Sequence, residues 1–260
     1  MTTPHQADVS DASTPETSES GWLGGRLRLK QPRKGYRAGL DAALLAAACD
    51  ASPGARLVEL GCGVGAVLIA VASRREGVMC LGVERDPSAV VLARDNAQIN
   101  GLSDRIEIVQ ANIAEAPAGL GQGRFDAALA NPPYFDDPTA LRGPAAAKRG
   151  AWMAEDGLDA WTDALTRLVR DRGVITVIHR ADRLADLLAG LGRRAGSFAI
   201  RPIHPHAEAP AKRVLVQAVK GGRAPLVLLP PLILHPGAGA AKHTPQTEAI
   251  LRGEAALGWA

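Results

Sequence analysis

The sequence lacks the features of three special classes of protein. No apolar run approaches the ~20 residues that a membrane-spanning helix requires, so we expect no membrane association. Residues 1–20 lack the positively charged start and the apolar core of a signal peptide. Cys49, Cys62 and Cys80 have no CxxC spacing, which argues against both a disulfide framework and a zinc site. We therefore expect a reduced, cytoplasmic protein without a bound metal.

Charged residues are distributed unevenly along the 260 residues of the chain. Residues 1–20 hold four of the 27 acidic residues and none of the 30 basic ones, so the remainder carries a net charge of +7. This acidic segment is rich in Ser, Thr and Pro and cannot bury a core, so we expect residues 1–21 to form a disordered tail. The chain as a whole, with 47% hydrophobic and 22% charged residues, has the composition of an ordinary globular protein.

A basic run follows this tail. Residues 26–37 contain no acidic side chain and six basic ones, which are Arg26, Arg28, Lys30, Arg33, Lys34 and Arg37. Two interpretations are open at this point. The run is either a solvated face, the usual role of surface charge, or a strip that contacts nucleic-acid phosphates without reading the base sequence.

Predicted strands and helices alternate along the rest of the chain. Short apolar runs predict strands, and longer stretches rich in Ala and Leu predict helices. The predicted strands are 56–60, 79–84, 105–109, 125–130, 173–178, 196–201 and 213–219, and the predicted helices are 40–49, 66–75, 87–100, 158–170 and 181–191. This alternation indicates an α/β fold, with a mostly parallel sheet and helices on both faces. We expect residues 226–234 to form an edge hairpin or an arm.

A glycine-rich turn lies between the first of these strands and its helix. Gly61, Gly63 and Gly65 permit a sharp turn and a close approach of the backbone to a ligand. Glu59 stands two residues before the turn. Glu84 ends the next strand, where a carboxylate can accept hydrogen bonds from both ribose hydroxyls. The pattern predicts a nucleotide site, and NAD is one candidate ligand, although the glycine spacing differs from the usual dinucleotide fingerprint.

The fourth strand ends in Asn131-Pro132-Pro133-Tyr134. Asn131 offers a side-chain carbonyl and an amide group, and Pro132 forces it into an extended conformation. Since prolines lack an N–H group, the carbonyl oxygens of this turn are available to a ligand, and Tyr134 adds a flat ring for stacking. The combination suits a planar amino group, although Asn-Pro and Pro-Pro also occur in ordinary turns.

Together these motifs resemble the class I S-adenosylmethionine-dependent methyltransferases that carry (D/N/S)PPY and methylate nitrogen. The resemblance extends to the bacterial tRNA(Val) adenine-N6 methyltransferases in four segments, which are 29–45, the glycine loop, 125–135 and 212–216. It implies a Rossmann-like fold of about seven strands, the last one antiparallel, with S-adenosylmethionine as cofactor. The implied organisation is one methyltransferase domain at 22–255, made of a basic substrate-side segment (22–50), a core (51–220) and a C-terminal arm (221–255).

The resemblance also implies roles for individual residues in holding the cofactor. Glu59 and the backbone of the three glycines would line its methionine end, and Glu84 would bind its ribose. Asn112 stands where the family usually has an Asp that contacts the adenine amine; the Asn keeps a carbonyl acceptor and loses the charge. The implied cofactor-binding residues are Arg37, Asp41, Glu59, Gly61, Gly63, Gly65, Glu84, Arg85, Asn112 and Asn131. Asp41 also has an ordinary role available, as an acidic residue in the first turn of a helix.

By the same resemblance, the catalytic residues would be Asn131, Pro132 and Tyr134. The expected acceptor is the N6 amine of an adenine in tRNA near the anticodon. The basic residues of 26–37 are expected to contact the RNA. Trp152 is a further candidate for contact with the substrate, and His204 and His206 are expected in a loop without metal. Related enzymes that methylate guanine N2 of rRNA or glutamine N5 of a protein share the central motifs. An NAD-dependent oxidoreductase and a non-catalytic RNA-binding module are the alternatives of a different class.

Overall fold

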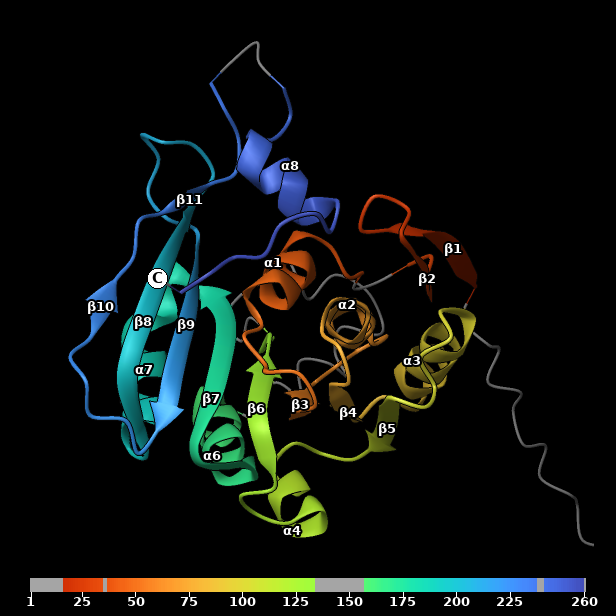
Figure 1. Cartoon of the computed structure of the whole chain (residues 1–260), viewed down its shortest axis with the longest axis horizontal. Helices are drawn as coiled ribbons and strands as arrows, with labels where there is room; N and C mark the ends of the chain where they lie inside the picture. Colours follow the sequence, from red (N-terminus) through yellow and green to blue (C-terminus); the bar gives the residue numbers. More distant parts are fainter. Residues whose placement is uncertain (1–15, 35–36, 134–156, 238–240, 260) are drawn as a thin grey trace, which may run out of the picture.

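The apolar runs of the sequence form a nine-stranded sheet at the centre of the protein (Figure 1). The computed structural model describes residues 16–34, 37–133, 157–237 and 241–259. The strands of this sheet are β3 (Arg56–Leu60), β4 (Met79–Glu84), β5 (Ile106–Gln110), β6 (Phe125–Ala130), β7 (Val169–Arg180), β8 (Ala195–His204), β9 (Arg213–Lys220), β10 (Val227–Leu228) and β11 (Leu232–Ile233).

The seven predicted strands form the core of this sheet, in the order β8-β9-β7-β6-β3-β4-β5. The pairs from β7 to β5 are parallel, and β9 runs antiparallel to both of its neighbours. The predicted Rossmann-like α/β fold, with its last core strand antiparallel, is therefore confirmed. The strand order reverses between β3 and β6, because the chain builds outward through β4 and β5 before it returns to the other side of β3.

Helices cover both faces of the sheet and bury a hydrophobic cluster on each. On one face pack α1 (Leu40–Ala48), α2 (Ala66–Arg74) and α3 (Pro87–Ile99), and on the other α4 (Ala116–Leu120), α6 (Leu158–Leu168) and α7 (Leu184–Gly192), the last preceded by the short helix η1 (Ala181–Arg183) (Figure 1). Helix α3 begins as its sequence predicts. Oδ1 of Asp86 accepts a hydrogen bond of 2.8 Å from the Ser88 N–H, and Pro87 occupies the first helical position.

The N-terminal part differs from the prediction. β1 (Thr17–Trp22) pairs antiparallel with β2 (Leu27–Pro32) in a separate two-stranded sheet. The predicted disordered tail is therefore wrong from Thr17 onward, while residues 1–15 lie outside the described residues. The physical reason is that β1 buries little and is ordered by backbone pairing with β2, which composition does not reveal.

Residues 226–234 lie at the edge of the sheet, as predicted, but they do not form the predicted hairpin. β10 and β11 do lie at that edge, but both pair parallel with β8, so they form no hairpin with each other. After α8 (Pro245–Leu251) the chain returns across α1 (Figure 1). There the Leu257 N–H donates to the Ala47 carbonyl and the Trp259 indole donates to the Ala48 carbonyl, each at 2.8 Å. The arm is thus part of the core packing around α1.

Three further features concern the described part of the chain. Cys49, Cys62 and Cys80 are free thiols, and all three are buried. Within the described ranges, no helix has the length and apolar character that a membrane span requires. The same ranges contain no group of three or more His, Cys, Asp or Glu side chains arranged to hold a metal ion.

Candidate active site

Four neighbouring strands carry predicted site residues at or just after their ends, along one edge of the sheet. Leu60, at the end of β3, is the register partner of Ala130 on β6 and of Val83 on β4. Glu84 in turn is the partner of Gln110 on β5. Side by side along this carboxyl edge therefore lie Asn131, the loop 61–65, Glu84 and Asn112. The strand order reverses at the same place, which is where open α/β sheets bind their ligands.

The three glycines of the loop all have a left-handed backbone, with φ of 64° at Gly61, 53° at Gly63 and 78° at Gly65. Their surroundings differ. A Cβ atom at Gly61 would lie 2.4 Å from Cη2 of Trp161 on α6, whereas a Cβ at Gly63 would meet no described atom within 4 Å. The loop is therefore packed against the protein at Gly61 and open at Gly63, where a ligand can approach the backbone.

Glu59 is almost completely buried at this edge, with 2% of its surface exposed. Its Oε2 atom has no hydrogen-bond partner among the described residues. Burial raises the pKa of the carboxyl group well above its ordinary value, and the charge of nearby Glu84 raises it further. A buried acceptor without a donor is costly, and a cation or an N–H group brought by a ligand would satisfy it. The position fits the ammonium group at the methionine end of the predicted cofactor.

Glu84 holds the glycine loop to the end of β4. Its Oε2 atom accepts a hydrogen bond of 2.9 Å from the Gly63 N–H, and its Oε1 atom accepts from the N–H groups of Arg85 and Asp86, both at 2.8 Å. These bonds fix the orientation of the carboxylate. A carboxylate oxygen can accept about two hydrogen bonds, so Oε1 is fully used and Oε2 keeps one acceptor site for a ribose hydroxyl.

Asn112 stabilises the turn that follows β5. Its Oδ1 atom accepts a hydrogen bond of 2.9 Å from the Ala114 N–H, and its main-chain carbonyl accepts from Glu115 and Ala116 at the start of α4. The predicted contact with an adenine amine would use the second lone pair of the same Oδ1 atom. This contact, like the one expected of Arg85 after β4, stays a prediction.

Asn131 begins the turn after β6, directly beside the glycine loop. Its neighbour Ala130 lies between Leu60 on β3 and Val177 on β7. Asn131 itself is partly buried and Pro132 is buried. The stretch 134–156 lies outside the described residues, and with it Tyr134 and Trp152. The stacking platform predicted there stays a prediction.

Arg37 and Asp41 lie on the two sides of the start of α1. Nη1 of Arg37 donates to Oγ of Ser18 and to the carbonyl of Pro32, each at 3.0 Å. Oδ2 of Asp41 forms an ion pair of 3.1 Å with Nε of Arg213 on β9. These side chains connect the start of α1 to the β1–β2 hairpin and to β9 of the central sheet. Their packing over the cofactor stays a prediction.

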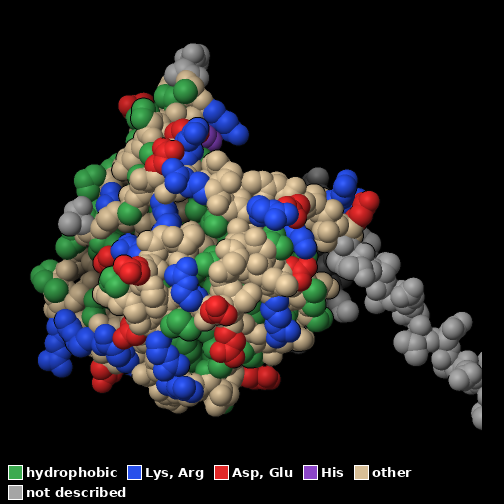
Figure 2. Space-filling model, turned by 45° about the vertical axis from the view of Figure 1, so that its right-hand side comes forward, with side chains coloured by type: hydrophobic (Ala, Val, Ile, Leu, Met, Phe, Trp, Pro, Cys, Tyr) green, Lys and Arg blue, Asp and Glu red, His purple; other side chains and the backbone are tan. Residues whose placement is uncertain are grey.

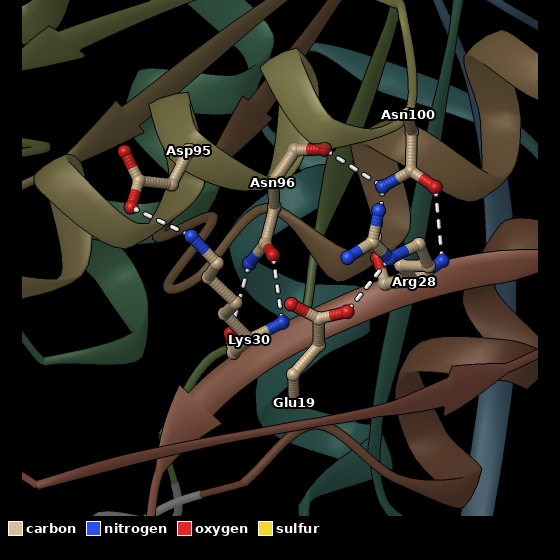
Figure 3. Close-up of polar contacts among 6 residues, drawn as sticks. All are labelled: Glu19, Arg28, Lys30, Asp95, Asn96 and Asn100. Carbon is tan, nitrogen blue, oxygen red and sulfur yellow. Dashed lines mark hydrogen bonds and ion pairs between the residues drawn. The ribbon is translucent and has the colours of Figure 1, made fainter.

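The basic run forms several ion pairs within the protein. Arg26 pairs with Glu254 at 3.5 Å. Arg28 pairs with Glu19 at 2.6 Å, and Lys30 pairs with Asp95 at 3.4 Å (Figure 3). Arg33 and Arg37, in contrast, donate to neutral oxygens. On the face shown in Figure 2, acidic and basic side chains are likewise interspersed. The run is thus in part a set of structural contacts, and the positive charges without a paired acid in the described structure lie at its C-terminal end.

Two residues of the site had no assigned role in the sequence. Trp161 lies against Gly61, and its indole N–H is buried without an acceptor among the described residues. Asn96, which is 0% exposed on α3, donates a hydrogen bond of 2.9 Å to the Val64 carbonyl inside the glycine loop. The one available signal was an Asn within a helix, where this residue is unfavourable unless its side chain has a partner.

Comparison with known protein sequences gives consistent matches. The model of the methyltransferase small domain matches residues 37–145. A tRNA1(Val) (adenine(37)-N6)-methyltransferase from Dickeya chrysanthemi is 30% identical over 80% of this chain and 83% of its own. A protein of the same name from Actinobacillus succinogenes is 29% identical over 63% of this chain and 69% of its own. A release factor glutamine methyltransferase from Escherichia coli is 32% identical, but over 53% of this chain and 44% of its own.

Solved structures agree with the sequence matches. Protein Atu636 from Agrobacterium tumefaciens, described as a predicted O-methyltransferase, has a TM-score of 0.70 and 30% identity, covering 84% of this chain and 98% of its own. An S-adenosylmethionine-dependent O-methyltransferase from Thermotoga maritima has a TM-score of 0.51 and 19% identity, covering 74% of this chain and 69% of its own, and is similar in fold alone.

Proposed function

The chain belongs to the methyltransferase small domain family of class I S-adenosylmethionine-dependent methyltransferases, and we propose that it methylates the N6 amine of an adenine in tRNA, next to the anticodon. The family establishes the type of reaction and the cofactor. It therefore excludes the alternative interpretation of the glycine pattern, an NAD-dependent oxidoreductase. The nitrogen acceptor rests on one observation, the position of Asn131 and Pro132 at the end of β6 beside the glycine loop. Similarity to the Dickeya protein over most of both chains favours tRNA.

The residues at the carboxyl edge suit this cofactor. The Oε2 atom of Glu59, which has no partner among the described residues, would face the ammonium group. The ligand would approach the backbone at the open side of Gly63, and Glu84 would bind the ribose. When bound, the cofactor supplies a methyl group on a positively charged sulfur, which is already activated toward a nucleophile. The protein therefore has mainly to align donor and acceptor, and alignment of this kind is worth about 7–11 kcal/mol.

The amine of adenine is a poor nucleophile because its lone pair is shared with the ring. In the proposed mechanism the Asn131 side-chain carbonyl and the Pro132 main-chain carbonyl each accept one amino hydrogen. The nitrogen then moves toward tetrahedral geometry, with its lone pair directed at the methyl carbon. A carbon–nitrogen bond forms as the carbon–sulfur bond breaks, and the nitrogen afterwards releases one proton to water. Both hydrogen bonds strengthen as positive charge grows on the nitrogen, so they stabilise the transition state more than the bound substrate.

An RNA loop is a suitable setting for this target. A base in a loop costs less to turn out of its stack than a paired base, and an aromatic ring such as that of Tyr134 would then stack on it. Arg33 and Arg37 carry charge that no described acid pairs with, and in the proposal they contact the RNA backbone. The three free thiols suit the reducing cytoplasm, where we propose that the enzyme acts.

The acceptor is tested by incubating the protein with labelled S-adenosylmethionine and, separately, with total tRNA, total rRNA and total protein. The proposal expects label in tRNA, recovered as N6-methyladenosine after digestion to nucleosides. Label in guanine of rRNA would contradict the tRNA proposal and would identify guanine N2 of rRNA as the acceptor. Label confined to the protein fraction would point to a glutamine acceptor, as in the release factor methyltransferases, and would refute the RNA proposal.

A further inference from the structure

Asn96 on α3 and Asn100 at its C-terminal cap bind the edge of β2 that is not paired with β1, as another strand would (Figure 3). Oδ1 of Asn96 accepts from the Lys30 N–H at 2.7 Å, and its Nδ2 donates to the Lys30 carbonyl at 2.9 Å. Asn100 repeats the pattern two strand residues earlier. Its Oδ1 accepts from the Arg28 N–H at 2.9 Å, and its Nδ2 donates to the Arg28 carbonyl at 2.8 Å.

The match between helix and strand has a geometric basis. Residues four apart on a helix are separated by about 6 Å along its axis. Alternate residues on a strand are separated by nearly the same distance, about 7 Å. Arg28 and Lys30 are alternate residues, so their peptide groups point to the same edge of β2, while the other edge pairs with β1. Two side-chain amides at this spacing therefore dock the whole hairpin on α3.

Asn96 also makes a contact that Asn100 lacks. Its Nδ2 atom donates a second hydrogen bond, of 2.9 Å, to the Val64 carbonyl, whereas the corresponding bond of Asn100 returns to the Asn96 carbonyl on the same helix. Val64 lies between Gly63 and Gly65 of the glycine loop (residues 61–65), which is the proposed cofactor loop. One buried side chain, 0% exposed, therefore holds the hairpin and the cofactor loop at once.

The Val64 contact completes the support of this loop. The Gly65 N–H donates to the Cys62 carbonyl at 2.9 Å, so the peptide between Val64 and Gly65 is held at both its oxygen and its nitrogen. The preceding Gly63 N–H is held by Glu84. Three glycines make a flexible segment, and fixing its peptide planes before binding reduces the entropy that the cofactor must overcome.

We propose that Asn96 is a positioning residue for S-adenosylmethionine, which couples the docking of the β1–β2 hairpin to the conformation of the cofactor loop. The coupling is reciprocal. A docked hairpin favours the loop conformation that binds the cofactor, and bound cofactor stabilises hairpin docking by the same factor. The proposal depends on the cofactor alone and is independent of whether the methyl acceptor is tRNA.

The test compares Asn96→Ala with Asn100→Ala by calorimetric titration with S-adenosylmethionine in the absence of RNA. Each substitution removes two hydrogen bonds to the β2 backbone and one other hydrogen bond. The two variants therefore lose the same number of hydrogen bonds between α3 and the hairpin. We expect the dissociation constant to rise about tenfold in Asn96→Ala, which corresponds to one buried hydrogen bond, and to change less than about twofold in Asn100→Ala. Equal dissociation constants in the two variants would overturn the proposal.

A second measurement uses the unaltered protein, in case Asn96→Ala does not fold. Amide hydrogen exchange over residues 27–32 is followed with and without saturating S-adenosylmethionine. We expect cofactor to slow exchange in this strand, with the Lys30 amide among the protected groups, because hairpin docking is coupled to the loop. Protection limited to residues 61–65, with unchanged exchange in β2, would contradict the coupling. Since neither experiment contains RNA, a failure here and a failure of the RNA assay are separate results.

Discussion

The aromatic ring of Trp161 lies directly against the backbone of Gly61, so close that a Cβ atom at Gly61 would be 2.4 Å from Cη2 of the indole. The first glycine of the cofactor loop is therefore required by packing as well as by its backbone angle of 64°. Gly63, two residues later, has a similar angle of 53° but no described neighbour within 4 Å of its missing side chain. The two glycines thus have different surroundings within one motif.

This difference predicts different outcomes for two alanine substitutions. Gly61→Ala should lower the free energy of unfolding by about 1–2 kcal/mol for the left-handed backbone and by a further ~1–3 kcal/mol for the overlap with Trp161. Gly63→Ala should show only the first cost, while its methyl group occupies the space proposed for the cofactor and weakens binding. Urea unfolding without ligand and calorimetric titration separate the two effects. Equal loss of stability in both variants would show that Trp161 does not restrain the loop.

Substitution of Glu59 should change both stability and its dependence on pH. The pKa of the buried carboxyl is raised well above 4.5 in the folded protein, mainly by burial. The folded state therefore keeps this proton where the unfolded state has lost it, and the free energy of unfolding falls as pH rises above about 4.5. Glu59→Gln removes this loss, so the cofactor-free variant should be more stable than the original protein at pH 8 but not at pH 4.

The same Glu59→Gln variant should bind S-adenosylmethionine about 10- to 100-fold more weakly, because a charge-assisted hydrogen bond to the ammonium group is lost. Binding to the original protein should release a proton at any pH at which the cofactor-free protein still holds it on Glu59, since the ammonium group favours the ionised carboxylate. Calorimetry in buffers with different ionisation enthalpies measures that proton. Unchanged affinity in the variant would place the ammonium group elsewhere.

Asn131→Ala is expected to affect catalysis far more than cofactor binding. The side-chain carbonyl is proposed to stabilise charge that develops only in the transition state, so kcat should fall about 100- to 1000-fold. The dissociation constant for S-adenosylmethionine should change only a few-fold. Glu59→Gln provides the contrasting variant, in which binding is the main loss. An Asn131→Ala protein with nearly normal kcat would rule out the proposed role of the amide.

The basic run at residues 26–37 offers a matched test of RNA binding. Arg33→Gln with Arg37→Gln removes two charges that face neutral oxygens, and Arg26→Gln with Arg28→Gln removes two that already pair with acids. The first pair should weaken tRNA binding and lower the slope of log K against log salt by about 1–2, because two phosphate contacts are lost. The second pair should leave the slope nearly unchanged. Identical slopes in the two double variants would contradict the proposed contacts.

The sequence alone was sufficient to predict the core strands of the fold. Strands such as 125–130 are short continuous apolar runs, and a parallel sheet buried on both faces needs strands of that kind. The site positions followed from the same reasoning, because parallel strands end at a common edge and bring Glu84 and Asn131 to it. β1 was missed because its residues bury little and its order comes from pairing with β2.

Local patterns of residues were therefore enough to predict the seven core strands, the glycine loop and the family of the enzyme. Tertiary structure alone decided which side chains support the loop and which charges are already paired. Asn96 meets Val64 across 32 residues and Asp41 meets Arg213 across 172, and no local pattern encodes contacts over such distances. The basic run shows the consequence, because its first three charges are paired with acids that the folded chain brings from Glu19, Asp95 and Glu254.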